Sequence, residues 1–349
     1  MKKIFFFFIM AVSCLFTSCV HKELCYDHPP HAKKWHLNLQ IDYQQEWEQR
    51  YGDGINWKEN WPDTAGVQYA DLIPNIPTGV RVRLYRANGN SEFVNIPAQG
   101  DVINVGEGEN SLILYNNDTE AILFNDLESF ASAQATTRGS TRSSYKGNSV
   151  VKSATKTEVT VTPPDMLYGS YIESIATEKQ VTPEDVKVTM KPLVYTYLIR
   201  YEFSNGLRYV SRMEGALAGM AGDVYLNSGR TSSRVVTLLY ECTKENFGGQ
   251  AIVNSFGIPD FPNDNYSKGD EDSNPKFGLN INVYLKNGKL FTFDFDVTDQ
   301  VKAQPHGGVI IVKGIEIPDD EGLEGSGGFD VDVDDWGDWE NIDLGIQRQ

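Results

Sequence analysis

Apolar and polar residues alternate at every second position in many stretches of this chain, which restricts its fold more than any other feature. Residues 36–43 place Leu and Ile on one face and polar residues on the other, as a half-buried strand does. The same period flanks Asn88-Gly89 and Asn287-Gly288, and Asn-Gly favours hairpins because both residues tolerate positive φ. With no long amphipathic helix pattern between the strands, the sequence predicts an all-β chain.

The predicted strands form two groups. The first comprises 36–43, 80–84, 93–96, 101–105, 111–115 and 121–124. The second comprises 157–161, 186–190, 193–203, 235–240, 279–286, 290–297 and 309–317. Residues 44–77 predict a long loop with a helical turn, and 215–222 predict a tight turn or a short helix packed against a sheet.

A Ser/Thr-rich stretch with few apolar residues divides the two groups. We predict a linker at 136–149 between an N-terminal domain at 33–135 and a C-terminal domain at 150–349. Its cations, such as Arg142, would also make a flexible linker a site for a trypsin-like protease.

The N-terminus has the pattern of an export signal, since two lysines precede an apolar run at 4–16. Thr17-Ser18-Cys19 resembles a bacterial lipobox, which predicts a signal peptide at 1–18, acylation of Cys19 and a tether at 19–32. Cleavage with release, or processing at Cys14, are the alternatives. No second apolar stretch of spanning length occurs, so acyl chains would be the membrane attachment.

Charge and motifs restrict the chemistry. The net charge of −17 argues against nucleic-acid binding, which needs clustered Lys and Arg. The sequence has no P-loop, nucleophile elbow, HExxH or Rossmann motif, so we expect no catalysis and no cofactor. Cys25, His28 and His31 have metal-compatible spacing but no evident fourth ligand, and the acidic run from Asp330 fails the EF-hand pattern, so no metal is expected.

Two further features suggest contacts. Trp47, Trp57 and Trp61 are candidate glycan contacts if they are exposed, although aromatic residues more often pack in cores. In the C-terminal tail, 329–346, Ile342, Leu344 and Ile346 alternate with polar residues as in a strand. That strand either completes the chain's own sheet or is lent to a partner.

Several short motifs carry a family resemblance. Residues 19–28 (CVHKELCYDH), 115–120 (YNNDTE), 164–169 (PDMLYG) and 217–222 (LAGMAG) resemble lipoproteins of Bacteroidetes, which in turn resemble the fimbrillin and fimbrial anchor-subunit (FimB-like) superfamily. The resemblance implies two tandem transthyretin-like β-sandwich domains after a lipoprotein signal peptide. It also implies a fimbrial or adhesive role in which one subunit lends a strand to another's sheet.

The same resemblance separates two kinds of subunit. Shaft subunits are cleaved after an arginine beyond the N-terminal strand, whereas anchors keep that strand and the lipid. The first arginine after Cys19 is Arg50, just past the strand at 36–43. We therefore expect an outer-membrane, surface-exposed fimbrial anchor, accessory or adhesion component, with fimbrial subunits and a host or glycan ligand as candidate partners. The alternative is a solitary lipoprotein that binds glycan through its Trp-rich N-terminal region.

Overall fold

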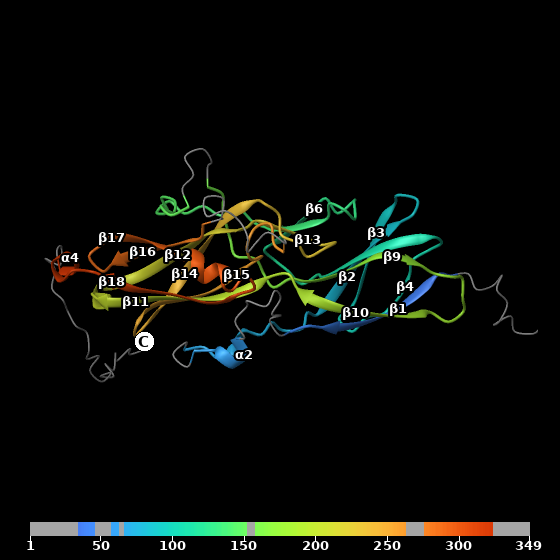
Figure 1. Ribbon diagram of the computed structural model, residues 1–349, viewed down its shortest axis with the longest axis horizontal. Helices are drawn as coiled ribbons and strands as arrows, with labels where there is room; N and C mark the ends of the chain where they lie inside the picture. The colour runs from blue at the N-terminus through green and yellow to red at the C-terminus, as the bar shows by residue number, and fades with distance from the viewer. Residues whose placement is uncertain (1–33, 46–56, 63–65, 152–157, 263–275, 324–349) are drawn as a thin grey trace, which may run out of the picture.

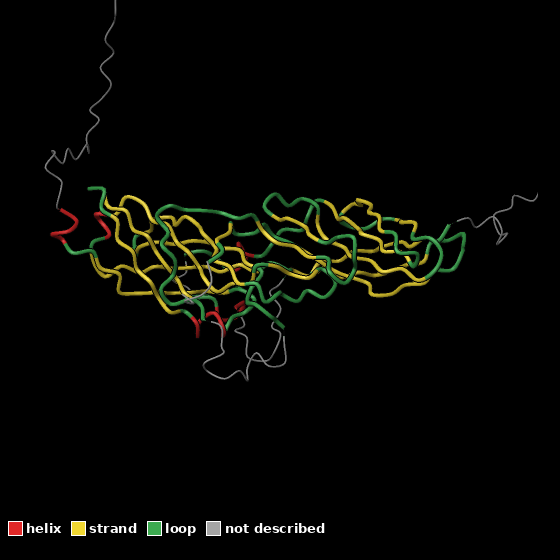
Figure 2. Tube along the Cα trace, turned by 90° about the horizontal axis from the view of Figure 1, so that it is seen from above, coloured by secondary structure: helices red, strands yellow, loops and turns green. Residues whose placement is uncertain are grey.

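Strands form most of the described chain and confirm the predicted all-β class. The computed structural model describes residues 34–45, 57–62, 66–151, 158–262 and 276–323. Two strand-rich parts lie end to end along one long axis (Figure 1). Most strands follow that axis. The molecule is also elongated when it is seen from above (Figure 2).

The first part is built on a sheet of seven described strands in the order β3-β2-β5-β9-β10-β1-β4. The strands are β1 (His36–Tyr43), β2 (Gly79–Arg86), β3 (Ser91–Pro97), β4 (Val102–Asn104), β5 (Glu109–Asn116), β9 (Tyr168–Ala176) and β10 (Glu184–Pro192). Alternate side chains of these strands, such as Leu39, Val82 and Leu112, form one buried core.

The second part is built on a sheet of eight described strands. Seven follow the order β17-β16-β12-β14-β15-β11-β18, and β8 pairs with β14. They are β8 (Thr160–Val161), β11 (Tyr195–Asn205), β12 (Val210–Ala221), β14 (Val235–Glu245), β15 (Gly248–Ser255), β16 (Gly278–Leu285), β17 (Leu290–Asp296) and β18 (Gly308–Glu316). Tyr197, Leu217 and Ile281 belong to its core.

A small third sheet joins the two parts. It consists of β6 (Ile122–Asn125), β7 (Gln134–Thr137) and β13 (Asp223–Tyr225). Its core unites Ile113 and Tyr115 of β5 with Leu193 and Phe256, which flank strands of the second sheet. Figure 1 shows β6 and β13 near the middle of the long axis.

The described helices are short. They are α2 (Trp57–Asn60), α3 (Thr298–Lys302) and α4 (Asp319–Leu323), with 3-10 turns at Tyr69–Leu72 and Leu207–Tyr209. α2 and the 3-10 turn at Tyr69–Leu72 fall in the loop predicted at 44–77, in agreement with the helical turn expected there.

The described chain starts and ends at opposite poles of the molecule. In the first sheet Tyr43 pairs with Met190, shortly before β10 leads into β11, so β1 ends at the junction of the two parts and His36 lies at the outer pole. In the second sheet β18 runs parallel to β11, from Gly308 near the junction to Glu316 at the far end. There α4 follows, at the left-hand end of Figure 1.

Strand pairing differs from the predicted division of the chain. β9 and β10 fall within 150–349, but they pair with β5 and β1 in the first sheet. The predicted linker at 136–149 begins inside β7 and continues as a segment bonded to the second sheet. Composition could not reveal this arrangement, because the bonds that order the segment come from residues far away in the sequence.

The predicted turn or short helix at 215–222 is wrong, because most of these residues lie within β12, which pairs with β14 and β16. The small residues serve close packing instead. A Cβ on Gly215 would lie 2.2 Å from the Tyr240 ring, so only glycine allows that ring its position. The hairpins at Asn88-Gly89 and Asn287-Gly288 are confirmed as β2–β3 and β16–β17.

Candidate functional site

The N-terminal strand β1 lies inside the first sheet. It pairs with β10 on one side and β4 on the other, and the Leu39 and Ile41 amides donate to carbonyls of the loop before β4, at 3.0 and 3.1 Å. Leu37 and Leu39 are fully buried. Gly100 allows the close approach, since a Cβ there would lie 1.8 Å from the Leu39 carbonyl oxygen. The first core therefore depends on the strand nearest the N-terminus.

The β18 edge of the second sheet is covered by two glutamines. The Gln304 amide accepts a bond from the Val309 amide and donates one to its carbonyl, both at 2.7 Å. Gln300 makes the same pair of bonds with Ile311, at 2.9 and 3.0 Å. These side chains replace a neighbouring strand along this stretch and hinder strand addition there.

The β17 edge is open among the described strands, because β17 pairs only with β16. At its two ends, the Val297 amide donates a hydrogen bond to the Phe277 carbonyl and the Leu285 amide donates one to the Lys289 carbonyl. In an antiparallel pair every second residue is bonded to the partner strand, so the backbone of Phe291, Phe293 and Phe295 bonds to β16. The N–H and C=O groups of Leu290, Thr292, Asp294 and Asp296 point away from β16. Those outward groups could pair with an added strand.

Helix α4 holds the described C-terminal end beside this edge. The Asn287 side-chain amide donates to the Glu321 carbonyl at 2.8 Å, and the Lys289 ammonium lies 2.7 Å from the Glu321 carboxylate. Asn287 and Lys289 belong to the turn that leads into β17. The last described residues of the chain therefore lie next to the start of the open edge.

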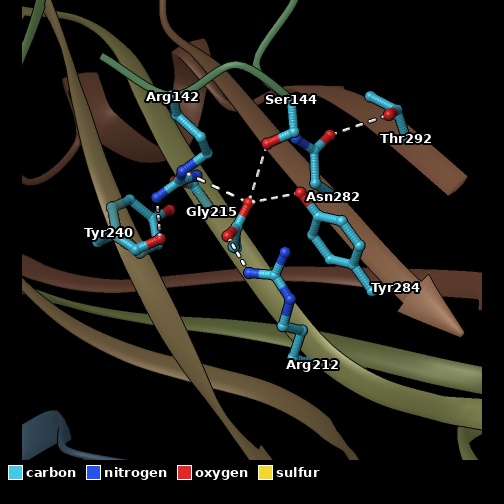
Figure 3. Close-up of polar contacts among 9 residues, drawn as sticks. Arg142, Ser144, Arg212, Gly215, Tyr240, Asn282, Tyr284 and Thr292 are labelled. Atoms are coloured by element: carbon cyan, nitrogen blue, oxygen red, sulfur yellow. Dashed lines mark hydrogen bonds and ion pairs between the residues drawn. The ribbon is translucent and has the colours of Figure 1, made fainter. Parts of the chain in front are cut away.

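A buried carboxylate fixes the predicted linker to the outer face of β12 and β16 (Figure 3). Glu214 accepts bonds from the Ser144 and Tyr284 hydroxyls, at 3.0 and 2.9 Å, and pairs with Arg142 and Arg212. Arg142 also donates to the carbonyls of Gly215 and Tyr240, at 3.0 and 2.8 Å. We call residues 138–148 the strap.

The environment of Glu214 favours its charged form. Burial by itself would raise the pKa of this carboxyl, but hydrogen bonds from Tyr284 and Ser144 and the positive charge of Arg142 hold the pKa below its usual value. A second carboxylate, Glu158, accepts a bond from the Tyr145 hydroxyl at 2.7 Å. Because Arg142 is bonded at three points, the expectation that it lies in a flexible, cleavable linker is wrong for this residue.

The described tryptophans of the candidate glycan site are packed. Trp57 and Trp61 meet edge to face with ring centroids 5.7 Å apart, over Leu198 and Val309 of the second sheet. The Trp61 indole donates to the Val67 carbonyl at 2.7 Å. Both rings are partly buried, so they stabilise the cover of this sheet face and present less surface to a sugar than exposed rings would.

The described residues offer little reactive chemistry. Burial raises the pKa of the Cys242 thiol to about 12, so this cysteine stays protonated and unreactive at neutral pH. No group of three or more His, Cys, Asp or Glu residues in the described ranges could hold a metal ion. In the same ranges no helix has the length and apolarity that crossing a bilayer requires.

The remaining predicted site residues lie outside the described residues. These are the lipidation candidate Cys19, the glycan candidate Trp47, and Ile342, Leu344 and Ile346 of the tail. Conversely, Glu214, Gln300 and Gln304 could not be predicted from the sequence, since a lone Glu or Gln in a strand-rich segment carries no local signal of the backbone or cation that it will contact.

Two sequence comparisons match most or part of this chain. A family model described as "Domain of unknown function (DUF5119)" matches residues 70–241. "Putative fimbrium anchoring subunit Fim4B" of Bacteroides ovatus is 24% identical over 317 residues, which cover 84% of this chain and 90% of the relative.

A solved structure shares the fold along most of its length. The crystal structure of a "putative adhesin" from Bacteroides ovatus superimposes with a TM-score of 0.58 at 18% identity, covering 84% of this chain and 95% of that one. The expected resemblance is thus confirmed: this chain resembles the fimbrillin and fimbrial anchor-subunit superfamily, and its residues 70–241 match the DUF5119 family.

Proposed function

We propose that this chain is a lipid-anchored subunit of a cell-surface fimbrium, serving as an anchor or accessory component that acts by assembly and not by catalysis. The proposal rests on one observation, that the described chain starts and ends at opposite poles of the molecule. The described chain enters at the outer pole of the first sheet and leaves at the opposite pole, beside the β17 edge. Acylation at Cys19 would hold the first pole near the membrane and present the second one outward.

The position of β1 supports an anchor over a shaft subunit. Loss of β1, as cleavage after Arg50 would cause, exposes the backbone of β10 and β4 and removes Leu37, Leu39 and Ile41 from the core. A subunit that keeps β1 keeps a filled first sheet. The name of the related Bacteroides ovatus protein, a fimbrium anchoring subunit, points the same way.

The assembly site in this proposal is the β17 edge. A strand added there would meet the outward backbone groups of Leu290, Thr292 and Asp294, which is the mode of recognition called β-augmentation. The alternating tail at 329–346 is one candidate strand, and a segment of another subunit is the other. Because β18 is covered by Gln300 and Gln304, β17 is the favoured edge of this sheet.

Proline at the edge tests the proposal. Thr292→Pro removes an N–H that points away from β16, so we expect a folded protein that no longer co-purifies with fimbrial subunits from its host. Phe93→Pro is the matched control, since the Phe93 amide points outward from the edge strand β3 by the same alternation, set by the Arg86–Asn90 bond. Equal co-purification of both variants and the unaltered protein would contradict assembly at β17.

A further inference from the structure

A cavity of about 190 Å³ lies where the two parts meet. The first sheet contributes the outward side of β9 and β10, including Tyr171 and Lys191. The second part contributes Tyr195, His306 and the turn at 226–229. The volume is below the roughly 300–1,000 Å³ of pockets for drug-sized ligands, so it suits a single small ring.

The described lining of the cavity carries charge of the opposite sign to the whole chain. The chain carries a net charge of −17, yet the described residues that line the cavity include no Asp or Glu. They include Lys191, which makes no ion pair with a described residue. Because no described carboxylate lines the cavity or pairs with this lysine, its charge is available to an anionic ligand, and hydrogen bonds between charged groups are stronger than neutral ones.

The strand register places an apolar wall beside this lysine. Lys191 stands directly opposite Gly169 in the β9–β10 pair, so no side chain faces it from β9. The space above Gly169 is bounded by Leu193, whose Cδ1 would lie 2.4 Å from a Cβ at Gly169. A glycine at this position therefore makes room for the Leu193 side chain, which forms part of the cavity wall.

Aromatic rings bound the cavity beside the lysine. Tyr171, in the middle of β9, is 46% exposed. Tyr195 and His306 are stacked with ring centroids 4.3 Å apart, and Phe261 meets His306 edge to face at 5.3 Å. Ring faces and edges of this kind pack against the C–H faces of a saturated ring.

The walls are held by backbone bonds before any ligand arrives. The Gly229 amide donates to the Tyr225 carbonyl and the Leu226 amide to the Ala133 carbonyl, at 2.8 and 2.9 Å. Gly307 lets the chain next to His306 lie close against β11, because a Cβ there would lie 2.4 Å from the Thr196 carbonyl oxygen. Such preorganisation lowers the entropic cost of binding.

From this juxtaposition we propose that the junction cavity binds an acidic sugar residue, whose carboxylate pairs with Lys191 while its ring packs against Tyr171 and the Tyr195–His306 stack. Hydroxyls of Thr189 and Ser228, and the amide of Gln44, line the same cavity and offer partners for sugar hydroxyls. This site is distinct from Trp57 and Trp61 and from the β17 edge. Its function does not require the proposed fimbrial role.

Binding of free sugars to the purified chain tests the proposal. Isothermal titration with glucuronic, galacturonic and N-acetylneuraminic acids should show saturable binding of at least one, with glucose, galactose and acetate at least about tenfold weaker. The three acids differ in the source from which they would come, a plant or bacterial polysaccharide or a host glycan, and their ranking identifies it.

Matched lysine variants separate this site from general charge attraction. Lys191→Met keeps the aliphatic stem and should weaken binding of the acidic sugar at least about tenfold. Lys187→Met changes an exposed lysine on the same face of β10, outside the cavity, and should leave binding unchanged. Tyr171→Ala should weaken binding without unfolding the protein, because the side chain is half exposed.

Three results would overturn the proposal. One is the absence of saturable binding by all three acids. Another is equal affinity for acetate and the sugars, which would mean that the ring is not recognised. The third is an equal loss of affinity in Lys191→Met and Lys187→Met.

Discussion

The two large sheets differ in how their terminal strands are used. In the first, β1 comes from the N-terminal end and lies between β10 and β4, where both of its edges are bonded. In the second, β17 and β18 are the outer strands. β18 is covered by Gln300 and Gln304, and β17 is open among the described strands.

The difference shows that the first sheet is completed by a strand of its own chain, whereas the second sheet has an edge available to another strand. A sheet that encloses its N-terminal strand has no vacancy to fill, so its edges matter less for assembly. Its outer strands also discourage pairing, since β4 has three residues and β3 ends in Pro97. A seven-residue edge such as β17, at the opposite pole from the proposed lipid, is better placed to meet another subunit.

The largest expected effect comes from a charge on the buried face of β1. Leu39→Asp places an unpaired carboxylate where the side chain is 1% exposed, and we expect it to cost more than about 4 kcal/mol of unfolding free energy. Gln40→Asp adds the same charge on the exposed face of the same strand and should cost less than about 0.5 kcal/mol. Denaturant unfolding measures both, and similar costs would mean that β1 is not part of the core.

The second effect concerns the strap. Glu214→Ala removes the shared partner of Arg142 and Ser144 and leaves a partly buried guanidinium without its carboxylate, at a cost of roughly 1–3 kcal/mol. Trypsin should then cut after Arg142, where the unaltered protein resists. The control is Glu241→Ala, an exposed carboxylate opposite Glu214 on β14. Rapid cleavage after Arg142 in the unaltered protein would show that the strap is not held.

Acid should loosen the same segment. Because the folded pKa of Glu214 lies below the unfolded value of about 4.5, its contribution to stability is complete above that pH and is lost as the pH falls through the lowered folded value. Amide hydrogen exchange of residues 140–148, corrected for the intrinsic pH dependence, should lose protection in that range. A Glu214→Gln variant should lack this transition. If the variant still loses protection in the same pH range, another titrating group is responsible.

The smallest effect should come from the cover of β18. Gln300→Ala and Gln304→Ala each remove two hydrogen bonds to the β18 backbone and should cost about 1 kcal/mol. The double variant exposes the edge, so sedimentation should detect concentration-dependent self-association that the unaltered protein lacks. If it stays monomeric, the glutamines do not guard the edge.

The sequence predicted what local rules determine. Hairpins at Asn88-Gly89 and Asn287-Gly288, and the alternation in β1, follow from φ preferences and period two. The strap was misread because Ser, Thr, Gly and basic residues make up most of it, while Glu214, which orders it, lies about 70 residues away. β12 was misread because its Gly and Ala residues disfavour strands in isolation, yet they fit between closely packed neighbours.

Intact mass of the protein purified from membranes of its own host tests the central claim most directly, because it shows whether β1 is kept. We predict an N-terminus at acylated Cys19, β1 present, and co-purifying subunits that are lost when Thr292 is replaced by proline. Loss of the same subunits when residues 338–349 are deleted would identify the tail as the added strand. A chain that begins after Arg50 would contradict the account, since β1 would then be absent from the mature first sheet.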